Sequence, residues 1–484
     1  MNHPYSKKWL ILFSMALGTI MVPINSSIVN VSLPTITSFF SASVSTAEWI
    51  LTSYLIVLLG LVLTFGKLGD LWGRGRLYIW GLVFFVVTSI LCSIAPSINL
   101  LILFRTLQGI GAAMMISVSL GIVKNAFPVQ ERGKALGMYA VAIAAGLALG
   151  PAIGGLVESL GGWRAIFLVN VPLGVVSFIS CYHILERGDR KSVEWDFKGT
   201  FLQFVGLFLI VYFLNIIEIP KITLESSIIG IIALIFLILF IWNEKVSKTP
   251  LLNLSLFKNR TFTAFNTSLL FNYLCMYMIL FIMPFYLKMV LHLNDRYIGL
   301  ILAVSPVVMM LMAPLSGYLS DKIGSRPLAL TGSLICAGAL YSMDQLTLFS
   351  SAYDVILRLG LLGLGAAIFQ SPNNKAIMNF APKKESGTIS SIVVTMRNLG
   401  MVFGVSMAGL LLHTTISSTL LEKEKLFNLA AYDFTQGMHL VVLFGAVLSV
   451  AMAVLAVVGM PDRIYRTKKI VKEVKNITLD SIKE

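Results

Sequence analysis

Long runs of apolar residues, separated by short polar segments, recur along the whole chain. Each run is close to the ~20 residues that an α-helix needs to cross a bilayer. We identify fourteen, at approximately 9–31, 47–68, 77–95, 99–123, 134–157, 164–185, 199–218, 225–243, 262–288, 297–319, 327–347, 352–378, 388–412 and 437–459. The pattern predicts an all-α membrane protein with fourteen transmembrane helices. The first run lacks a small-residue cleavage site, so we interpret it as a retained helix.

Charge is scarce and unevenly placed. Only 12% of the 484 residues are charged, about half the usual share in soluble domains. An even helix number puts both termini on one side, and that side receives 28 of the 37 Lys and Arg residues, against six in the opposite loops. This distribution predicts cytoplasmic termini in the cell membrane and argues against nucleic-acid binding despite the net charge of +14. The basic tail 460–484 is either solvated or bound to anionic lipid.

No motif for catalysis, metal binding or nucleotide binding is present. The four cysteines are solitary, the five histidines form no H-E-x-x-H, and no Walker A sequence occurs. The sequence therefore predicts no enzyme, no cofactor and no metal site.

The chain repeats itself at a shift of 251 to 254 residues. "GKLGDLWGRGR" (66–76) matches "GYLSDKIGSRP" (317–327), and "GIGAA" (109–113) matches "GLGAA" (363–367). Gly146, Gly150 and Gly155 match Gly400, Gly404 and Gly409. The repeat predicts two parallel six-helix bundles, 1–185 and 262–459, with a linker, 186–261, whose two extra helices (199–218 and 225–243) are inserted. Transporters built from two such repeats bind substrate between them near the bilayer midplane.

The first repeated motif is a tight turn between the second and third helices. Glycine permits a close backbone approach, Asp70 suits the N-terminal end of a helix, and Arg74 can pair with Asp70 or with the other bundle. We expect a cytoplasmic latch that forms in one state and parts in the other; the simpler reading is a basic cytoplasmic loop. The expected latch residues are Gly66, Asp70, Gly73, Arg74, Asp321 and Arg326.

The fifth helix carries a stripe of small residues and a proline. Small residues let membrane helices touch backbone to backbone, and proline kinks the axis. "GLALGPAIGG" therefore predicts close packing and, beyond that, a hinge or sliding surface, formed by Gly146, Gly150, Pro151, Gly154 and Gly155.

These motifs together resemble the major facilitator superfamily. "GKLGDLWGRGR", "RTLQGIGAA" and "GLALGPAIGG" are similar to its motifs A, B and C, the last being associated with antiporters. "TAEWILTSYLI", "FPVQERGKALG" and "WRAIFLVNVPLG", with fourteen helices, resemble its drug:proton antiporter branch. The resemblance covers nearly the whole chain. It implies export driven by proton influx, with Arg105 near proton coupling.

The first helix departs from the branch pattern. The family pattern resembles L-D-x-T-I-V-N-V-A-L-P, whereas this chain has "INSSIVNVSLP", with Asn25 where the acid would be. A preference for polycationic substrates is therefore in doubt. Asn25, Ser26, Asn30 and Ser32 share a broad arc of the helix, which either lines a cavity or hydrogen-bonds to neighbouring helices.

Other polar groups inside predicted helices mark further candidates. Arg105, Gln108 and Met115 share one stripe of the fourth helix, and a membrane-embedded arginine is costly enough to indicate function, although Arg105 could instead be a structural anchor. In the second bundle, Gln370, Asn373 and Asn374 flank a proline and predict cavity polarity. The remaining proton-coupling candidates are Asp344, Asp354, Arg358, Arg397 and Glu158. Asp354 and Arg358 can pair, with Asp344 nearby, as an outer gate, a proton-accepting cluster or an interfacial salt bridge. Glu158 is either a proton carrier or an interfacial residue.

The sequence thus predicts a monomeric, proton-coupled exporter of amphipathic or lipophilic small molecules, in contact with substrate, protons and lipid. The first alternative is a transporter of one physiological solute, such as a lipid, an organic anion or a metabolite. A second is a membrane sensor or scaffold, which the repeated latch disfavours because a scaffold needs no moving halves.

Overall fold

The computed structural model describes residues 7–128, 131–185, 196–217, 223–247, 254–379, 386–414 and 427–459. The regular structure of these residues is entirely helical. The first eight helices are α1 (Lys8–Phe39), α2 (Val44–Trp72), α3 (Arg74–Ser93), α4 (Ile98–Ala126), α5 (Arg132–Leu168), α6 (Asn170–Ile184), α7 (Phe197–Ile216) and α8 (Leu224–Val246). After a short 3-10 turn, η1 (Leu254–Lys258), follow α9 (Arg260–Phe285), the π-turn η2 (Tyr286–Val290), α10 (Asp295–Leu302), α11 (Val304–Ile323), α12 (Ser325–Met343), α13 (Ala352–Asn379), α14 (Ser386–His413) and α15 (Phe427–Gly459).

These helices confirm the predicted fold class. Each of the fourteen apolar runs corresponds to one helical span, and twelve spans of the described residues meet both the length and the hydropathy expected of a membrane crossing. The tenth run is divided at Ala303 into α10 and α11. The predicted boundary between the fifth and sixth runs appears as a break at Gly162, whose φ of 71° favours glycine.

The two repeated turns share one backbone conformation. Gly73 ends α2 with φ 94°, and Gly324 ends α11 with φ 92°. The N–H of each donates back to the carbonyl four residues earlier, Gly69 and Ser320. Because L-residues rarely adopt this φ, the repeat requires glycine at both positions.

Helix packing repeats as well. A Cβ added at Gly109 would meet the Tyr54 carbonyl of α2, and one added at Gly363 would meet the Ser305 carbonyl of α11. Gly146 lies in the same way against α1, and its counterpart Gly400 against α9. The pairs α2–α4 and α1–α5 are therefore reproduced by α11–α13 and α9–α14, because the glycines that permit contact occur at matching positions.

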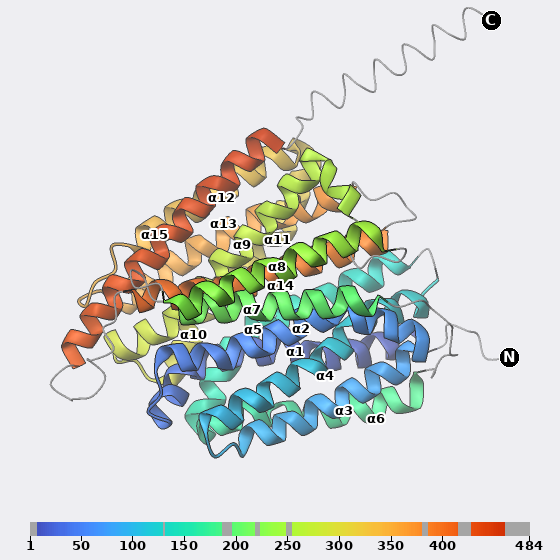
Figure 1. The fold of residues 1–484 in the computed structure, drawn as a ribbon, viewed down its shortest axis with the longest axis horizontal. Helices are drawn as coiled ribbons and strands as arrows, with labels where there is room; N and C mark the ends of the chain where they lie inside the picture. The colour runs from blue at the N-terminus through green and yellow to red at the C-terminus, as the bar shows by residue number, and fades with distance from the viewer. Residues whose placement is uncertain are drawn as a thin grey trace, which may run out of the picture.

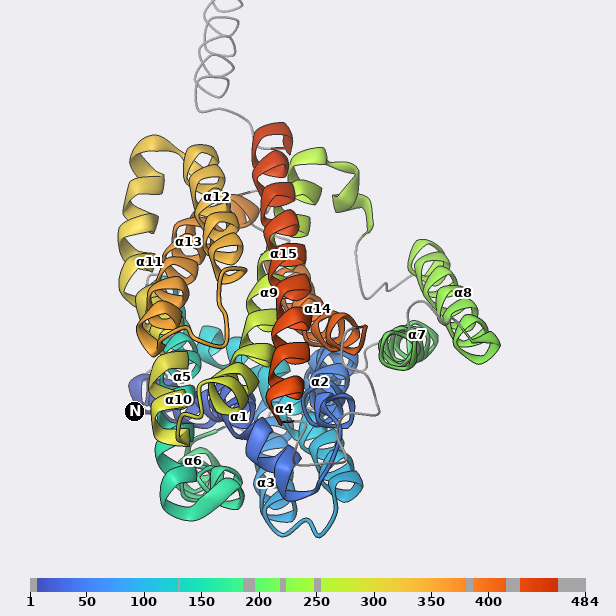
Figure 2. The ribbon, with the colours of Figure 1, turned by 90° about the vertical axis from the view of Figure 1, so that its left-hand side faces the viewer.

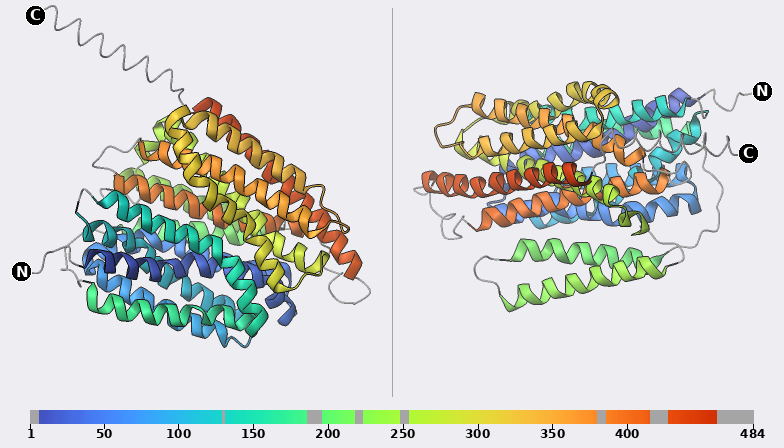
Figure 3. Two further views of the ribbon diagram at one scale, coloured as in Figure 1. Left: turned by 180° about the vertical axis from the view of Figure 1, so that it is seen from behind. Right: turned by 90° about the horizontal axis from the view of Figure 1, so that it is seen from above.

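Two groups of helices form the body of the molecule. Helices α1–α6 lie together, as do α9–α15, and the groups converge at one end, where α10 packs on α5 (Figure 1). The start of α1 and the end of α15 lie at the other end, where the groups diverge (Figure 3, left). We call these the converging end and the diverging end. The sequence-based topology predicts that the diverging end is cytoplasmic.

Helices α7 and α8 form a separate antiparallel pair on one flank (Figures 2 and 3). They pack on each other, and α7 also packs on α2 and α14. Much of α8 is exposed and apolar, as at Ile231, Leu234, Ile238 and Trp242. This composition is typical of a lipid-facing surface.

Candidate functional site

Arg105 occupies the centre of the first group and is fully buried. Its Nε donates to the Ile50 carbonyl of α2 at 3.0 Å, and its Nη1 donates to Gln108 Oε1 at 2.5 Å. The guanidinium also lies over the Tyr54 ring, 4.2 Å from the centroid. Its Nη2 has no hydrogen-bond partner among the described residues. Two hydrogen bonds and a cation–π contact thus hold a charge that would otherwise be costly within the membrane.

Asn25 extends this network across two more helices. Its Nδ2 donates to Gln108 Oε1 at 3.1 Å, and its Oδ1 accepts from Asn170 Nδ2 of α6 at 3.1 Å. Gln108 Nε2 donates to Ser89 Oγ of α3 at 2.7 Å. Asn25 is only 1% exposed, so in this conformation the amide joins helices through hydrogen bonds. Ser89 and Asn170 are network members that sequence reasoning missed, because a single Ser or Asn in an apolar run gives no indication of its partner.

The other polar residues of α1 lie outside this network. Asn30 Nδ2 donates within its own helix to the Ser26 carbonyl at 3.0 Å, while its Oδ1 has no partner among the described residues. Ser32 donates to Glu158 Oε2 at 2.6 Å. Met115, buried on α4, packs against α3 at Gly81. The predicted stripe of α4 is therefore divided between polar contacts at Gln108 and helix packing at Met115.

The second group contains its own buried amides. Gln370 Nε2 donates to Asn272 Oδ1 of α9 at 2.7 Å and contacts Met276 Sδ at 3.3 Å. Asn373 Nδ2 donates to the Phe265 carbonyl at 3.2 Å. The Oδ1 atoms of Asn373 and Asn374 have no partner among the residues described. Asn272, which the sequence did not single out, completes this arrangement on α9.

Arg397 places a positive charge between the two groups. Its surroundings include the phenols of Tyr277 on α9 and Tyr139 on α5. Its Nε has no hydrogen-bond partner within the described ranges. Arg397 therefore has a different environment from Arg105, whose charge is enclosed within one group.

Glu158 lies in a polar cluster at the converging end. It is 3% exposed, and the charges near it are Asp295 and Lys288 of the second group. Lys288 Nζ and Asp295 Oδ1 are 2.5 Å apart, and Thr35 of α1 donates to the same oxygen at 3.4 Å. The cluster joins α1 and α5 to η2 and α10, so its charges bear directly on contact between the two groups.

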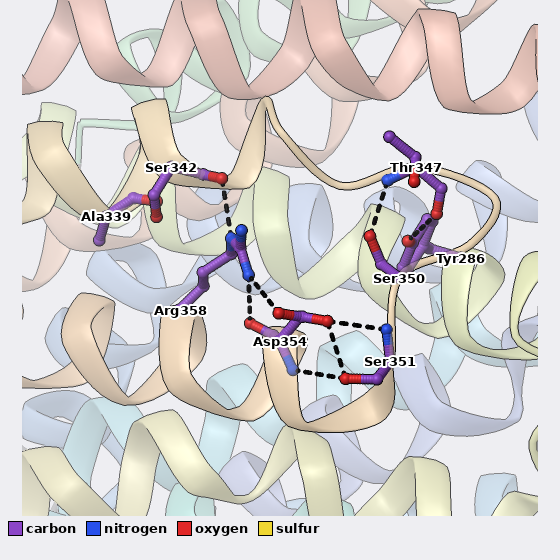
Figure 4. A network of polar contacts seen from close by, with 8 residues as sticks. All are labelled: Tyr286, Ala339, Ser342, Thr347, Ser350, Ser351, Asp354 and Arg358. Carbon is purple, nitrogen blue, oxygen red and sulfur yellow. Dashed lines mark hydrogen bonds and ion pairs between the residues drawn. The ribbon is translucent and has the colours of Figure 1, made fainter.

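The predicted Asp344–Asp354–Arg358 cluster is divided in two. Arg358 Nη1 is 3.4 Å from Asp354 Oδ1 and its Nε donates to the Ser342 carbonyl at 2.8 Å, as Figure 4 shows. Asp354 also accepts from the N–H and hydroxyl of Ser351 (Figure 4). Asp344 instead lies 2.8 Å from His439 Nδ1 of α15. Asp354 and Arg358 therefore tie together the end of α12 and the start of α13.

The expected latch residues lie at the diverging end, in or beside the two repeated turns: Gly73 forms the first turn, and the others lie in the adjoining ends of α2, α3, α11 and α12. Arg74 lies along α4, where a Cβ added at Gly121 would be 2.5 Å from its Nη1. Asp321 pairs with Lys375 of α13, a contact within the second group. Gly66 has open space around its Cβ position, and Arg326 is the second residue of α12, after Ser325. The side chain of Asp70 lies outside the described residues, so the latch stays a prediction.

The small residues of α5 contact two different helices. A Cβ added at Gly146 would meet Ile20 and Pro23, one at Gly150 would meet Ser27 Oγ, and one at Gly154 would meet Ile28, all on α1. Gly155 and Pro151 face α10 of the other group, where a Cβ added at Gly299 would lie 2.9 Å from Gly155 Cα. The stripe thus packs α5 on its own group and also forms a backbone contact between groups.

Glu48 is a buried carboxyl that the sequence reasoning passed over. It lies near the start of α2 and is fully buried. A Cβ added at Gly409 of α14 would meet its Oε2. The available signal was an acid within the quoted "TAEWILTSYLI". That signal is weak, because a single acid close to a predicted helix end does not indicate burial.

Comparison with known proteins agrees with this architecture. The family model described as Major Facilitator Superfamily matches residues 15–405 and 265–476. The riboflavin transporter RibZ of Clostridioides difficile is 34% identical over 402 residues, covering 83% of this chain and 87% of that protein. The multidrug resistance protein Stp of Mycobacterium tuberculosis is 30% identical over 416 residues, covering 85% of this chain and 77% of that protein.

A further relative and a solved structure extend the comparison. The multidrug transporter protein MdtP of Bacillus subtilis is 29% identical over 422 residues, covering 86% of this chain and 78% of that protein. A bacterial homologue of the human lysosomal transporter Spinster, crystallised inward-facing and unoccupied, has a TM-score of 0.67 at 15% identity, covering 94% of this chain and 97% of that one. The repeated helix pairs, the membrane-spanning helices and these matches lead to one conclusion: the chain belongs to the major facilitator superfamily and is a multi-pass membrane transporter, not an enzyme.

Proposed function

We propose that the protein exports amphipathic small molecules in exchange for protons, as a member of the fourteen-helix drug:proton antiporter branch. Residues 1–185 and 262–459 would rock against each other, with 186–261 as a linker carrying α7 and α8. The observation that carries the proposal is the arrangement of the two groups. They converge at one end through glycine contacts. Each group contains a buried polar network, and these networks include Asn25 of α1 and Asn272 of α9, two helices that pack on each other across the groups.

The chemistry of these networks favours substrates without a high positive charge. Their members are mainly amides, such as Asn25, Gln108, Gln370 and Asn373. An amide donates and accepts hydrogen bonds but does not ionise. Neutral or weakly charged molecules with aromatic surface and a few polar groups suit such an environment. The names of RibZ, Stp and MdtP, which cover riboflavin and drugs, support this substrate class.

Proton coupling requires a group that gains and loses a proton during the cycle. Asn25 occupies the place of the family acid and cannot serve. Glu158 is the candidate among the predicted residues, because it is buried between the groups beside Asp295 and Lys288. Arg105, through Ile50 and Gln108, would set the electrostatic field of the first group.

The decisive test is flux into proteoliposomes under an imposed pH gradient, with a panel of drugs, riboflavin and lipophilic cations. We expect gradient-driven uptake of several amphipathic compounds, abolished by a protonophore. Arg105→Lys should lower that uptake by about tenfold or more, since lysine cannot reproduce the two-sided guanidinium contact. Lys258→Arg, on the short turn η1, is the matched control. A lack of uptake of every compound under any gradient would contradict the proposal.

A dedicated transporter for one solute is the second candidate. The 34% identity to a riboflavin transporter favours it, as does the ordered pairing of Asn25 with Gln108 and Asn170, because fixed hydrogen-bonding groups favour selective recognition. The same panel separates the two candidates. Uptake confined to riboflavin, or to another single lipid, organic anion or metabolite, would replace the multidrug proposal.

A further inference from the structure

Glu48 lies where three parts of the molecule meet. Its own helix α2 belongs to the first group, α14 to the second, and α7 to the inserted pair. These three helices lie side by side in the view along the bundle (Figure 2) and pack on one another. The polar side chains beside the carboxyl are Ser406 of α14 and Asn215 of α7.

The polar atoms at this junction are poorly satisfied. Four buried polar atoms here have no hydrogen-bond partner among the described residues: the two carboxyl oxygens of Glu48, the hydroxyl oxygen of Ser406 and the amide nitrogen of Asn215. Asn215 Oδ1 is already used, since it accepts from Trp49 Nε1 at 2.8 Å. An ionised carboxylate buried in this way costs several kcal/mol, and the neutral acid costs much less.

The internal repeat shows that this carboxyl is an exception at its position. A shift of 251 residues, the one that aligns Gly73 with Gly324, places Glu48 on Gly299. Gly155 of α5 contacts Gly299 of α10, and its repeat counterpart Gly409 of α14 contacts Glu48 of α2. These are two equivalent contacts at the converging end. In the contact between α5 and α10, glycine packs on glycine. In the contact between α14 and α2, glycine packs on the carboxyl group of Glu48.

We propose that Glu48 is a proton-binding site that controls closure of the converging end. With a proton bound, α2 and α14 pack together and the end closes. Release of the proton leaves a carboxylate, whose charge must be hydrated to be stable. Water reaches the carboxylate only when α2 separates from α14. Protonation therefore favours the closed form, and a higher pH at this end favours opening. The inference rests on the alternating access in the proposed function, but not on the substrate.

Among the residues that the structure describes, few other charges lie on the helices packed against this site. On the helices packed against α2, the charged groups nearest to Glu48 along the helix axes are Arg105 of α4, bound to the Ile50 carbonyl, and Arg397 of α14, about three turns away. The titratable groups of α7 are Lys198, at the opposite end of the helix from Asn215, and Tyr212, whose ring lies 6.0 Å from that of Trp49. The described Lys and Arg side chains of α1 and α3, namely Lys8, Arg74 and Arg76, lie at the diverging end.

The test measures the distance across the converging end as a function of pH. Cysteines at Leu160 and Phe349, which are 81% and 95% exposed, carry spin labels in nanodiscs. The four native cysteines are buried, and the parent chain reports background labelling. Between about pH 5.5 and about pH 8.5, we expect the long-distance population of the parent to grow. Glu48→Gln should keep the short distance throughout, with a pH response reduced about fivefold or more.

Two further variants keep the test independent of simple misfolding. Gly409→Ala should open the end at every pH, because its Cβ would meet Glu48 Oε2, and the added Glu48→Ala change should restore closure. Glu244→Gln, a buried glutamate of α8, is the matched control and should retain the parental response. A pH-independent parent, or a parental response in Glu48→Gln, would overturn the proposal. So would a response lost in Glu158→Gln but retained in Glu48→Gln.

The outcome separates this inference from the proposed function. If the distance responds to pH but no gradient-driven flux is seen, the proposal for Glu48 stands and the proposal of proton-coupled export fails. If gradient-driven flux is seen but the distance in Glu48→Gln responds to pH as in the parent, the export proposal stands and the proposal for Glu48 fails.

Discussion

At the scale of single residues, hydrogen bonding decides what the polar groups in the helices do. Asn25 has partners on both sides, Gln108 and Asn170, at 3.1 Å each. Glu48 has none among the residues described. Removing one partner of a buried hydrogen bond costs about 1–3 kcal/mol. The first residue is therefore expected to organise its group, and the second to respond to its surroundings.

The Asn25 side chain provides the first prediction. Asn25→Leu leaves Asn170 Nδ2 without its acceptor, so we expect lower thermal stability and a larger loss of transport than in Asn25→Ser. Asn25→Asp restores an ionisable group beside Gln108 and should shift selectivity toward cationic compounds, with a steeper dependence on pH. The measurement is the same compound panel for all three variants at matched expression. If Asn25→Asp and Asn25→Leu both transport every compound as the parent does, Asn25 contributes only to helix packing.

At the scale of helices, α5 is one of the elements that contact both groups. Its glycines bring it onto α1, and Gly155 brings it onto α10. Since membrane helices associate through close packing more than through the hydrophobic effect, one added methyl group at such a contact has a large effect. Its repeat counterpart α14 packs on α9 in the same way.

The contact between α5 and α1 provides the second prediction. A Cβ at position 150 would meet Ser27 Oγ, so Gly150→Ala should lower the melting temperature in detergent and slow transport. Ser27→Ala removes that oxygen, and the double variant should recover part of both losses. Gly338→Ala, where nothing lies within 4 Å of the Cβ position, is the control. Equal effects at positions 150 and 338 would contradict the packing argument.

The inserted pair provides the third prediction, that α8 takes no part in the transport path. Ile235 is 48% exposed on α8, so a cysteine there should react with a lipophilic maleimide at the same rate with or without substrate. A cysteine at Ser26 of α1 should be protected by substrate. Leu207 on α7 is as buried as Ser26, and a cysteine there should react at a rate that substrate does not change. Protection at position 235 without protection at position 26 would require a different transport path.

At the scale of the whole molecule, orientation follows from charge. The sequence puts most of the Lys and Arg residues on the side of the termini, and we therefore propose that the diverging end is cytoplasmic. The structure would then be closed to the outside, and the site at Glu48 would respond to external pH. Both halves have the same orientation because eight helices, α1–α8, precede the second half, and an even number of crossings returns the chain to the side where it began.

The fourth prediction tests this orientation. Cysteines at Ser6 and Ser481 should resist impermeant thiol reagents in intact cells and react after permeabilisation. A cysteine at Phe349, in the loop before α13, should react in intact cells. Labelling of either terminus from outside would reverse the topology and, with it, the side from which Glu48 senses pH.

Much of the architecture is readable from the sequence because membrane helices obey local rules. A run of apolar residues must satisfy its backbone hydrogen bonds internally, so the fourteen runs indicate the helices directly. Glycines at matching positions, such as Gly73 and Gly324, reveal the repeat because only glycine readily adopts their backbone conformation.

The tertiary structure alone decides which side chains meet. The helical period predicts that Asn25 and Ser32 share one face of α1. In the structure, Asn25 hydrogen-bonds to Gln108 and Asn170, whereas Ser32 hydrogen-bonds to Glu158. Asp344 likewise pairs with His439, 95 residues away, instead of joining Asp354. Periodicity fixes the face of one helix, whereas the partner on another helix depends on how the two pack. For the same reason only the contact of α2 with α14 shows that Glu48, which the sequence reasoning did not single out, is buried against Gly409.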